Sequence, residues 1–209
     1  MIATKSDAEI HKLIANALCL NFANTLYGHG NVPIHEYLKD YRDLVLWSRH
    51  AGILDERQAD ALIREGTRRP TEAVATFHRA IALRETLFRT FAAIANGESP
   101  KPNDLAALNS ARTDALSHSK IDRSGDRFNI AWTDEVALAR VLWPIALSAA
   151  ELLTSEDLHR VRECDGDTCD WLFVDTSRNH LRRWCSMHEC GNRAKVRRYL
   201  KRKRKLALQ

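Results

Sequence analysis

Apolar residues recur at helical spacing along most of the first 155 residues. Segments in which they fall three or four positions apart predict helices over residues 8–26, 34–51, 55–66, 71–97 and 103–116. Asp55, Thr71 and Asn103 are candidate N-terminal caps for the last three of these helices. The segment 8–26 has almost no polar face, so we expect it to be deeply buried.

The pattern changes to period two near residue 128. Phe128, Ile130 and Trp132 alternate with polar residues and follow the turn-like cluster DRSGD, which predicts a β-hairpin that begins near Lys120. An apolar helix is expected over 134–154, where the ring of an internal proline should kink or divide it. The expected fold class is therefore mainly α with a small β-hairpin.

Composition narrows the class of protein. The chain has 209 residues, 44% of them hydrophobic, and no apolar run approaches the roughly 18 residues that a membrane span needs. The first twenty residues contain acids and no small-residue cleavage pattern, so a secretory signal is not expected. We expect a cytoplasmic protein that does not contact membranes, in which disulfides explain cysteines poorly.

Charge is distributed unevenly along the chain. Residues 178–209 contain twelve Lys or Arg and one acid, a net charge of +11, whereas the other residues carry a net charge of −6. A mildly acidic body with a strongly basic segment is typical of proteins that bind polyanions.

Four cysteines, Cys164, Cys169, Cys185 and Cys190, have the spacing C-x4-C-x15-C-x4-C. Two close pairs separated by a short gap can place four sulfurs around a tetrahedral zinc ion, and iron is the alternative metal. Four thiolates complete a structural site, so we predict one structural Zn²⁺ and no catalysis at the metal.

Elements around the cysteines resemble a treble-clef arrangement. A turn is followed by a strand candidate at 171–175, and the segment RRW at 182–184 could pair with it before the last cysteine pair opens a helix. His180 and His188 lie near enough to compete as ligands, but we expect both to lie at the surface or beside the ligands. Cys19, in an apolar segment, is expected to be a small core residue.

A basic helix is expected from Gly191 onward. Val196, Tyr199 and Leu200 form a narrow apolar stripe that could dock on the rest of the protein. The density of positive charge suits a phosphate backbone, and the alternative is a solvated basic tail. The candidate nucleic-acid-binding residues are Arg182, Arg183, Arg193, Lys195, Arg197, Arg198, Lys201, Arg202, Arg204 and Lys205.

The segment 164–199 closely resembles the CGNR zinc-finger family, whose name is spelled by residues 190–193. The companion elements FxDxS at 173–177, RRWC at 182–185 and NRAK at 192–195 are also present. Upstream, LCLNFANTL resembles the LxLDFxNT opening of the ABATE domain, with Asn21 in place of the usual Asp. The resemblance implies a bacterial, stress-linked transcription regulator with a mostly helical N-terminal domain and the four cysteines as metal ligands.

Physical roles can be assigned within this motif. Gly191 would let the backbone pass close to the metal, and Asn192 would cap the amides at the helix start. Asp175 and Ser177 would stabilise the hairpin turn between this strand and RRW through local side-chain hydrogen bonds.

Asn21, Asn24 and Thr25 are polar groups in an otherwise apolar segment. If they are buried they need partners. They would either line a pocket for a small-molecule effector or form an internal hydrogen-bond network that holds the packing.

The sequence therefore predicts a helical ABATE-like domain over 1–157, and a four-cysteine, treble-clef-like zinc finger with a basic helix over 158–209. The expected function is zinc-dependent binding of nucleic acid, as a regulator that contacts double-stranded DNA and can form a homodimer. One alternative is a module that binds RNA or protein. The other is an enzyme with its site in the helical domain, although we expect no enzyme, since the chain lacks a P-loop and a dinucleotide fingerprint.

Overall fold

The computed structural model describes residues 11–29, 35–133 and 136–206. The α-helices are α2 (Leu18–Ala23), α3 (Tyr41–His50), α4 (Glu56–Arg68), α5 (Pro70–Ala95), α6 (Pro102–Ser117), α7 (Trp143–Thr154) and α8 (Asn192–Leu206). Shorter helical turns are η1 (Leu138–Leu142), η2 (Glu156–Arg160) and η3 (Met187–Gly191). The antiparallel strand pairs are β1 (Leu26–Tyr27) with β2 (His35–Glu36), β3 (Ser119–Ser124) with β4 (Arg127–Trp132), and β5 (Val161–Glu163) with β6 (Leu172–Val174).

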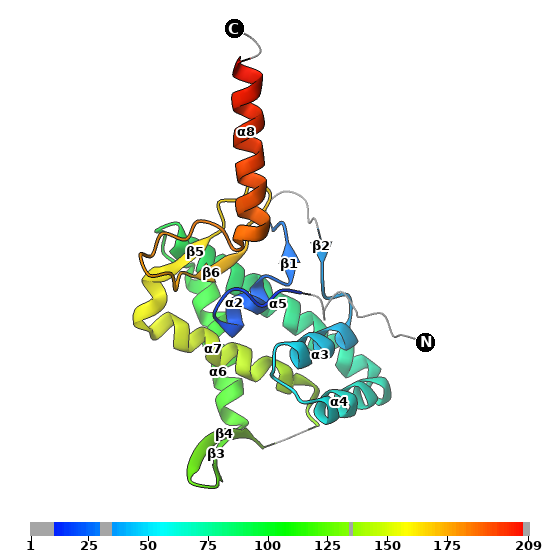
Figure 1. The fold of residues 1–209 in the computed structure, drawn as a ribbon. Helices are drawn as coiled ribbons and strands as arrows, with labels where there is room; N and C mark the ends of the chain where they lie inside the picture. The colour runs from blue at the N-terminus through cyan, green and yellow to red at the C-terminus, as the bar shows by residue number, and fades with distance from the viewer. Residues whose placement is uncertain (1–10, 30–34, 134–135, 207–209) are drawn as a thin grey trace.

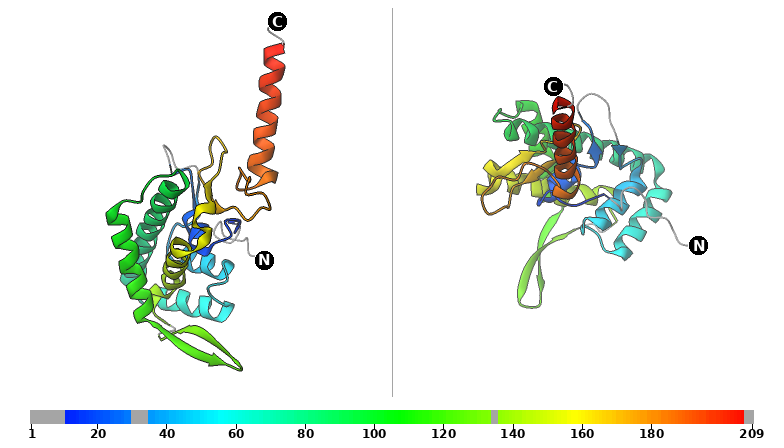
Figure 2. Two further views of the ribbon diagram at one scale, coloured as in Figure 1. Left: turned by 90° about the vertical axis from the view of Figure 1, so that its left-hand side faces the viewer. Right: turned by 45° about the horizontal axis from the view of Figure 1, so that its top comes forward.

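Helices α2 to α7 form a body from which two elements project (Figure 1). The long helix α8 extends from one end of the body, and the β3–β4 hairpin extends from the other end (Figures 1 and 2). The predicted fold class, mainly α with a small hairpin and a cysteine cluster in the C-terminal part, is confirmed.

Helices α4, α5 and α6 confirm the three helices predicted for the middle of the chain. Asp55 caps α4 as expected, because its carboxylate accepts a hydrogen bond from the amide of Gln58 at 2.8 Å. Helices α5 and α6 begin instead at Pro70 and Pro102, whose fixed φ suits the first turn of a helix. The Thr and Asn caps predicted one residue further on are therefore not used.

The helix predicted over 8–26 is wrong in length. Within the described part of this range, residues 11–26, only the six residues of α2 are helical. Asn16 has a φ of 60°, in the left-handed region, which a right-handed helix cannot accommodate. The segment before α2 instead lies along β6, where the amide of Val174 donates to the carbonyl of Ala15 at 2.9 Å. Phe22 in α2 is fully buried, so the apolar pattern reflects packing on several sides.

The helix predicted over 34–51 begins later, at α3, and residue 34 lies outside the described residues. Asp40 caps α3 by accepting from the amide of Asp43 at 2.9 Å. The residues before this cap form β2, which Arg84 of α5 holds through two hydrogen bonds to the Glu36 carboxylate at 2.7 and 2.9 Å. The apolar spacing of this segment is also compatible with a helix, but the ion pair with Arg84 holds it in an extended conformation.

The predicted hairpin is present as β3 and β4, and its apolar face is open to solvent. Ile121 lies directly opposite Ile130, and these side chains are 80% and 58% exposed. The apolar helix predicted over 134–154 is divided as expected: η1 precedes α7, and Pro144 occupies the first turn of α7. Residues 134 and 135 lie outside the described residues.

One hydrophobic core continues from the helical body into the cysteine-bearing region. Phe22, Trp47 and Phe91 of the body belong to the same buried cluster as Phe173 of β6. The side chain of Asn24 accepts from the amide of Leu172 at 2.9 Å and donates to its carbonyl at 2.9 Å. Because the two parts share one core, the boundary predicted between residues 157 and 158 stays a prediction.

The predicted pairing of RRW with the strand after the first cysteine pair is wrong. Strand β6 pairs with β5, with Val161 opposite Val174, and the arginines of RRW lie in a loop. Val161 and Val174 are both buried, so pairing with β5 places two more apolar side chains in the shared core.

Candidate metal centre and nucleic-acid interface

The first cysteine pair lies on a tight turn after β5. The amide of Cys164 donates to the carbonyl of Trp171 at 3.0 Å, and the amide of Cys169 donates to the carbonyl of Gly166 at 2.9 Å. A Cβ atom on Gly166 would lie 3.3 Å from the Sγ of Cys190 and 3.5 Å from the Sγ of Cys164. A larger residue at position 166 would crowd the sulfurs.

The second cysteine pair leads directly into α8, since Cys190 lies in η3. Gly191 was expected to let the backbone approach the metal, and the structure gives this glycine a different reason. A Cβ atom there would lie 2.9 Å from the Sδ of Met187 and 3.6 Å from the Trp184 ring. Gly191 makes room for side-chain packing under the helix, and Gly166 is the glycine beside the sulfurs.

The four thiols converge on one point. The Sγ atoms of Cys164, Cys169, Cys185 and Cys190 all lie within 4.8 Å of one another, and each of these four cysteines is at most 6% exposed. The Cys169–Cys185 and Cys185–Cys190 sulfur pairs are each 3.6 Å apart. Tetrahedral zinc with bonds of about 2.3 Å requires sulfurs about 3.8 Å apart. The cysteines are positioned to bind one metal ion, consistent with one structural Zn²⁺.

Electrostatics within the cluster also favour a cation. Hydrogen bonds from the thiols of Cys169 and Cys185 lower the pKa of Cys164. The same contacts raise the pKa values of Cys169 and Cys185, because each of these thiols keeps its proton to donate it to Cys164, and burial and the neighbouring thiolate charge add to the effect. A divalent cation among the sulfurs removes this conflict, since zinc binds thiolates and displaces their protons.

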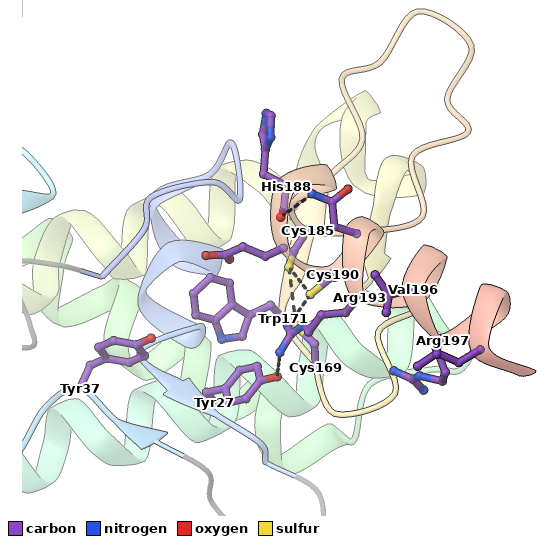
Figure 3. Close-up of a pocket in the computed structure, with 13 residues that line it drawn as sticks. Tyr27, Tyr37, Cys169, Trp171, Cys185, His188, Cys190, Arg193, Val196 and Arg197 are labelled. Atoms are coloured by element: carbon purple, nitrogen blue, oxygen red, sulfur yellow. Dashed lines mark hydrogen bonds between the residues drawn. The ribbon is translucent and has the colours of Figure 1, made fainter.

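N–H groups of the backbone and of a side chain donate to the sulfurs. The amide of Cys185 donates to the Sγ of Cys164 at 3.3 Å, and the guanidinium of Arg193 donates to the Sγ of Cys190 at 3.0 Å. Arg193 also donates to the hydroxyl of Tyr27 in β1 at 3.4 Å (Figure 3), and that hydroxyl is 3.0 Å from the Oγ1 of Thr168. Both cysteine-bearing turns are thereby linked to the body.

Sequence reasoning missed Tyr27 and Thr168, because no local pattern connects β1 with the cysteines. Arg193, which was assigned to nucleic acid, bonds to a cysteine ligand.

Three other arginines proposed for nucleic acid also have partners within the protein. Arg182 donates to the carbonyl of Trp184 at 3.0 Å and stacks 4.2 Å above the Phe173 ring. Arg183 pairs with the first turn through Asp165 at 2.6 Å, and Arg197 pairs with Asp167 in the same turn. These contacts hold the loop and the root of α8 against the first cysteine turn.

The remaining cations of α8 face solvent. Lys195, Arg198, Lys201, Arg202 and Arg204 are exposed, and none has an ion-pair partner among the described residues. Lys203 has the same exposure and was missed, although its place in the basic run was sufficient to find it. The side chain of Lys205 lies outside the described part of the structure.

The apolar stripe of α8 does not dock as predicted. Val196, Tyr199 and Leu200 are 57%, 64% and 49% exposed, because the helix leaves the body soon after its first turn (Figure 2). Val196 and Leu200 instead border a cleft at the root of the helix.

The polar groups near α2 are satisfied by protein atoms. Asn21 accepts from the amide of Ala15 at 3.0 Å, and Thr25 donates to the carbonyl of Phe22 at 2.7 Å. Together with the two bonds of Asn24 to β6, these contacts form the internal network that was the alternative to an effector pocket.

The local roles proposed around the motif hold in part. The carboxylate of Asp175 accepts from the amides of Ser177 and Arg182, each at 2.9 Å, which stabilises the turn as expected. Asn192 does not cap α8, because its side-chain amide donates to the carbonyl of His188 at 3.0 Å. His180 and His188 are both exposed, as predicted.

In the described residues, no helix is both long and apolar enough to cross a membrane.

Comparison with known families agrees with this architecture. The ABATE family model, described as "Putative stress-induced transcription regulator", matches residues 16–156, and the CGNR zinc finger model matches residues 160–203. No curated protein matches the chain. Because the first model covers more than half of the sequence, the chain belongs to the ABATE family and carries a CGNR zinc finger.

Proposed function

We propose that this protein regulates transcription by binding double-stranded DNA through α8, which the zinc centre holds in place. The observation that carries the proposal is the row of cations, without ion-pair partners in the described part of the chain, along a helix that projects from the body (Figure 1). Residues 192–206 contain nine Lys or Arg and no acid. Such a helix can neutralise several phosphates at once and release their counterions.

The dimensions and faces of α8 suit a major groove. Its 15 residues span about 22 Å, and an α-helix fits a groove about 12 Å wide. Lys195, Arg198 and Arg202 are three and four residues apart, so they share one face of the helix. Arg193 lies on the opposite face, at the zinc centre. The helix can therefore present one face to DNA while its root is held by the other.

The alternatives fit α8 less well. The major groove of double-stranded RNA is too deep and narrow for side chains to read. Single-strand binders stack bases on several aromatic side chains, and α8 carries only Tyr199. An enzyme at the metal would need an open coordination position, which four thiolates do not leave. We therefore propose a DNA-binding protein without catalysis at the metal; the absence of an active site in the helical domain, a homodimer and an effector stay predictions.

Titration of zinc-loaded protein with duplex DNA, the matching single strand and a duplex RNA, at several salt concentrations, tests the proposal. Duplex DNA should bind tightest, and a selected duplex should bind better than random sequence. A logarithmic salt slope of about −4 to −5 is expected if five cations contact phosphates. Equal affinity for all three nucleic acids, or for selected and random DNA, would contradict a sequence-specific regulator.

Charge removal on α8 provides a matched test of the interface. Arg198→Ala and Arg202→Ala should each reduce the magnitude of the salt slope by about 1 without changing the zinc content. Arg64→Ala, on the exposed surface of α4 at the far end of the body, serves as the control and should leave the slope unchanged. A slope that fell equally in all three variants would show that net charge alone drives binding.

A further inference from the structure

A cleft lies where the root of α8 faces β1 and the cysteine turns (Figure 3). Its volume is about 780 Å³, within the range of small-molecule sites. Tyr27, Tyr37 and Trp171 line one side, and Val196 and Leu200 of α8 line the other. The cleft is therefore mainly aromatic and aliphatic, and its volume suits a small organic molecule.

One polar atom in this wall has no partner. Trp171 is only 5% exposed, and its indole Nε1 has no hydrogen-bond partner among the described residues. Figure 3 shows the nitrogen-bearing edge of the indole on the side of the ring between Tyr27 and Tyr37. A buried N–H group without an acceptor is costly, so a ligand that supplies an acceptor there would gain affinity.

Charged groups around the cleft are mostly paired. Glu189 pairs with Lys12, and Arg197 pairs with Asp167. Arg193 bonds to the Sγ of Cys190 and to Tyr27, but it has no carboxylate partner among the described residues. A guanidinium has five N–H donors, so Arg193 keeps donors for an anion while it offsets the negative charge of the cysteine cluster.

We propose that this cleft binds a planar aromatic carboxylate. The ring system lies between the aromatic wall and the aliphatic side chains of α8. The carboxylate accepts hydrogen bonds from the Trp171 indole and from Arg193. The proposal does not depend on DNA binding, because it concerns a pocket of the zinc-loaded protein alone.

Calorimetric titration of the full-length, zinc-loaded protein with 2-naphthoate tests this assignment. The matched probes 2-naphthamide and 2-naphthylmethylamine keep the ring but replace the carboxylate with a neutral or a cationic group. We expect saturable one-to-one binding of naphthoate, binding of the amide weakened at least about tenfold, and no binding of the amine. Amide or amine binding as tight as naphthoate, or no saturable binding of naphthoate, overturns the proposal.

Two variants of α8 locate the site without disturbing the fold. Val196→Glu places a negative charge in the cleft, and Tyr199→Glu places the same charge on an exposed position that does not line it. The first variant should lose naphthoate binding, and the second should keep it within about twofold. Equal binding by both variants overturns the location.

A third variant tests the unpartnered indole. Trp171→Phe keeps an aromatic ring but removes the N–H, and naphthoate should bind about three- to tenfold more weakly. Zinc content and the midpoint of thermal unfolding, measured on the same sample, exclude misfolding as the cause. Unchanged affinity in correctly folded Trp171→Phe overturns the role given to the indole. Duplex DNA binding measured in parallel separates failure of this proposal from failure of the DNA-binding function.

Discussion

Arginines that look alike in the sequence do three different things in the structure. Arg182 donates to backbone carbonyls and stacks on a core ring, Arg193 donates to a cysteine sulfur, and Arg198 points into solvent. Only the last kind is available to a phosphate without breaking an existing contact. The number of arginines in a basic segment therefore overestimates the number of nucleic-acid contacts.

Replacement of Arg193 by Ala should weaken zinc binding more than it weakens DNA binding. Loss of the N–H···S bond and of the link to Tyr27 should reduce zinc affinity about 10- to 100-fold, the usual effect of removing a group that orients a metal ligand. Competition with a chromophoric chelator measures this affinity. Lys195→Ala, two residues away and exposed, is the control and should keep the affinity of the native protein.

His11 should make the protein sensitive to acid. Burial lowers the pKa of His11 to about 4, and the neutral ring accepts from the Trp47 indole at 3.2 Å while its other nitrogen contacts the carbonyl of Asn24 at 3.0 Å. In the unfolded chain the His11 ring takes up a proton near pH 6.5, whereas in the folded protein it stays neutral until about pH 4. Stability should therefore fall as the pH drops from about 6.5 to about 4, by about 3 kcal/mol in total.

Urea unfolding at several pH values measures this effect. His11→Gln should flatten the pH dependence within that window, even if the variant is less stable at every pH. The native protein and the His11→Gln variant hold zinc through the same cysteines. The difference between their stability profiles against pH therefore excludes the contribution of thiolate protonation. Identical profiles would contradict the assignment to His11.

At the scale of elements, the bounds of a helix or strand could be predicted when the contacts that set them come from residues nearby in the sequence. The start of α4 was predictable because Asp55 and Gln58 set it locally, and the cysteine spacing revealed the metal ligands for the same reason. The end of α2 was not, because Asn24, which follows the helix, bonds there to Leu172, 148 residues away in sequence. Arg193 and Tyr27 show the same limit at the metal centre.

Interruption of α8 tests whether the helix acts as a rigid element. Leu200→Pro keeps every positive charge but breaks the helix in its middle, at a cost of about 3 kcal/mol. If a rigid helix contacts DNA, affinity for the selected duplex should fall at least about tenfold while zinc content stays the same. A solvated basic tail would bind equally well with or without the proline. Leu200→Ala, which preserves the helix, is the control.

At the scale of the whole molecule, the zinc finger and the helical body form one packing unit. Phe173 of the finger lies in the same buried cluster as Phe22, Trp47 and Phe91 of the body. The metal therefore organises part of the core of the body as well as the root of α8. A chain with this arrangement cannot lose its finger without exposing apolar surface on the body.

Removal of zinc should accordingly destabilise the entire protein. Structural zinc contributes on the order of 10 kcal/mol to folding, and about 1 kcal/mol corresponds to 2–4 °C for a chain of this size. We expect the calorimetric unfolding midpoint to fall by at least about 10 °C after chelation and to recover when zinc is restored. A body transition that does not move would show that the two parts fold independently.

The double hydrogen bond between Asn24 and Leu172 has a consequence for engineering. A side chain of the body occupies the free edge of β6, as a third strand would do, so an excised finger would present unpaired amides and carbonyls at that edge. Transplantation of the finger onto an unrelated carrier would therefore need a substitute for that asparagine. A finger exchanged between two relatives that both have an asparagine at this position should keep the edge of β6 paired.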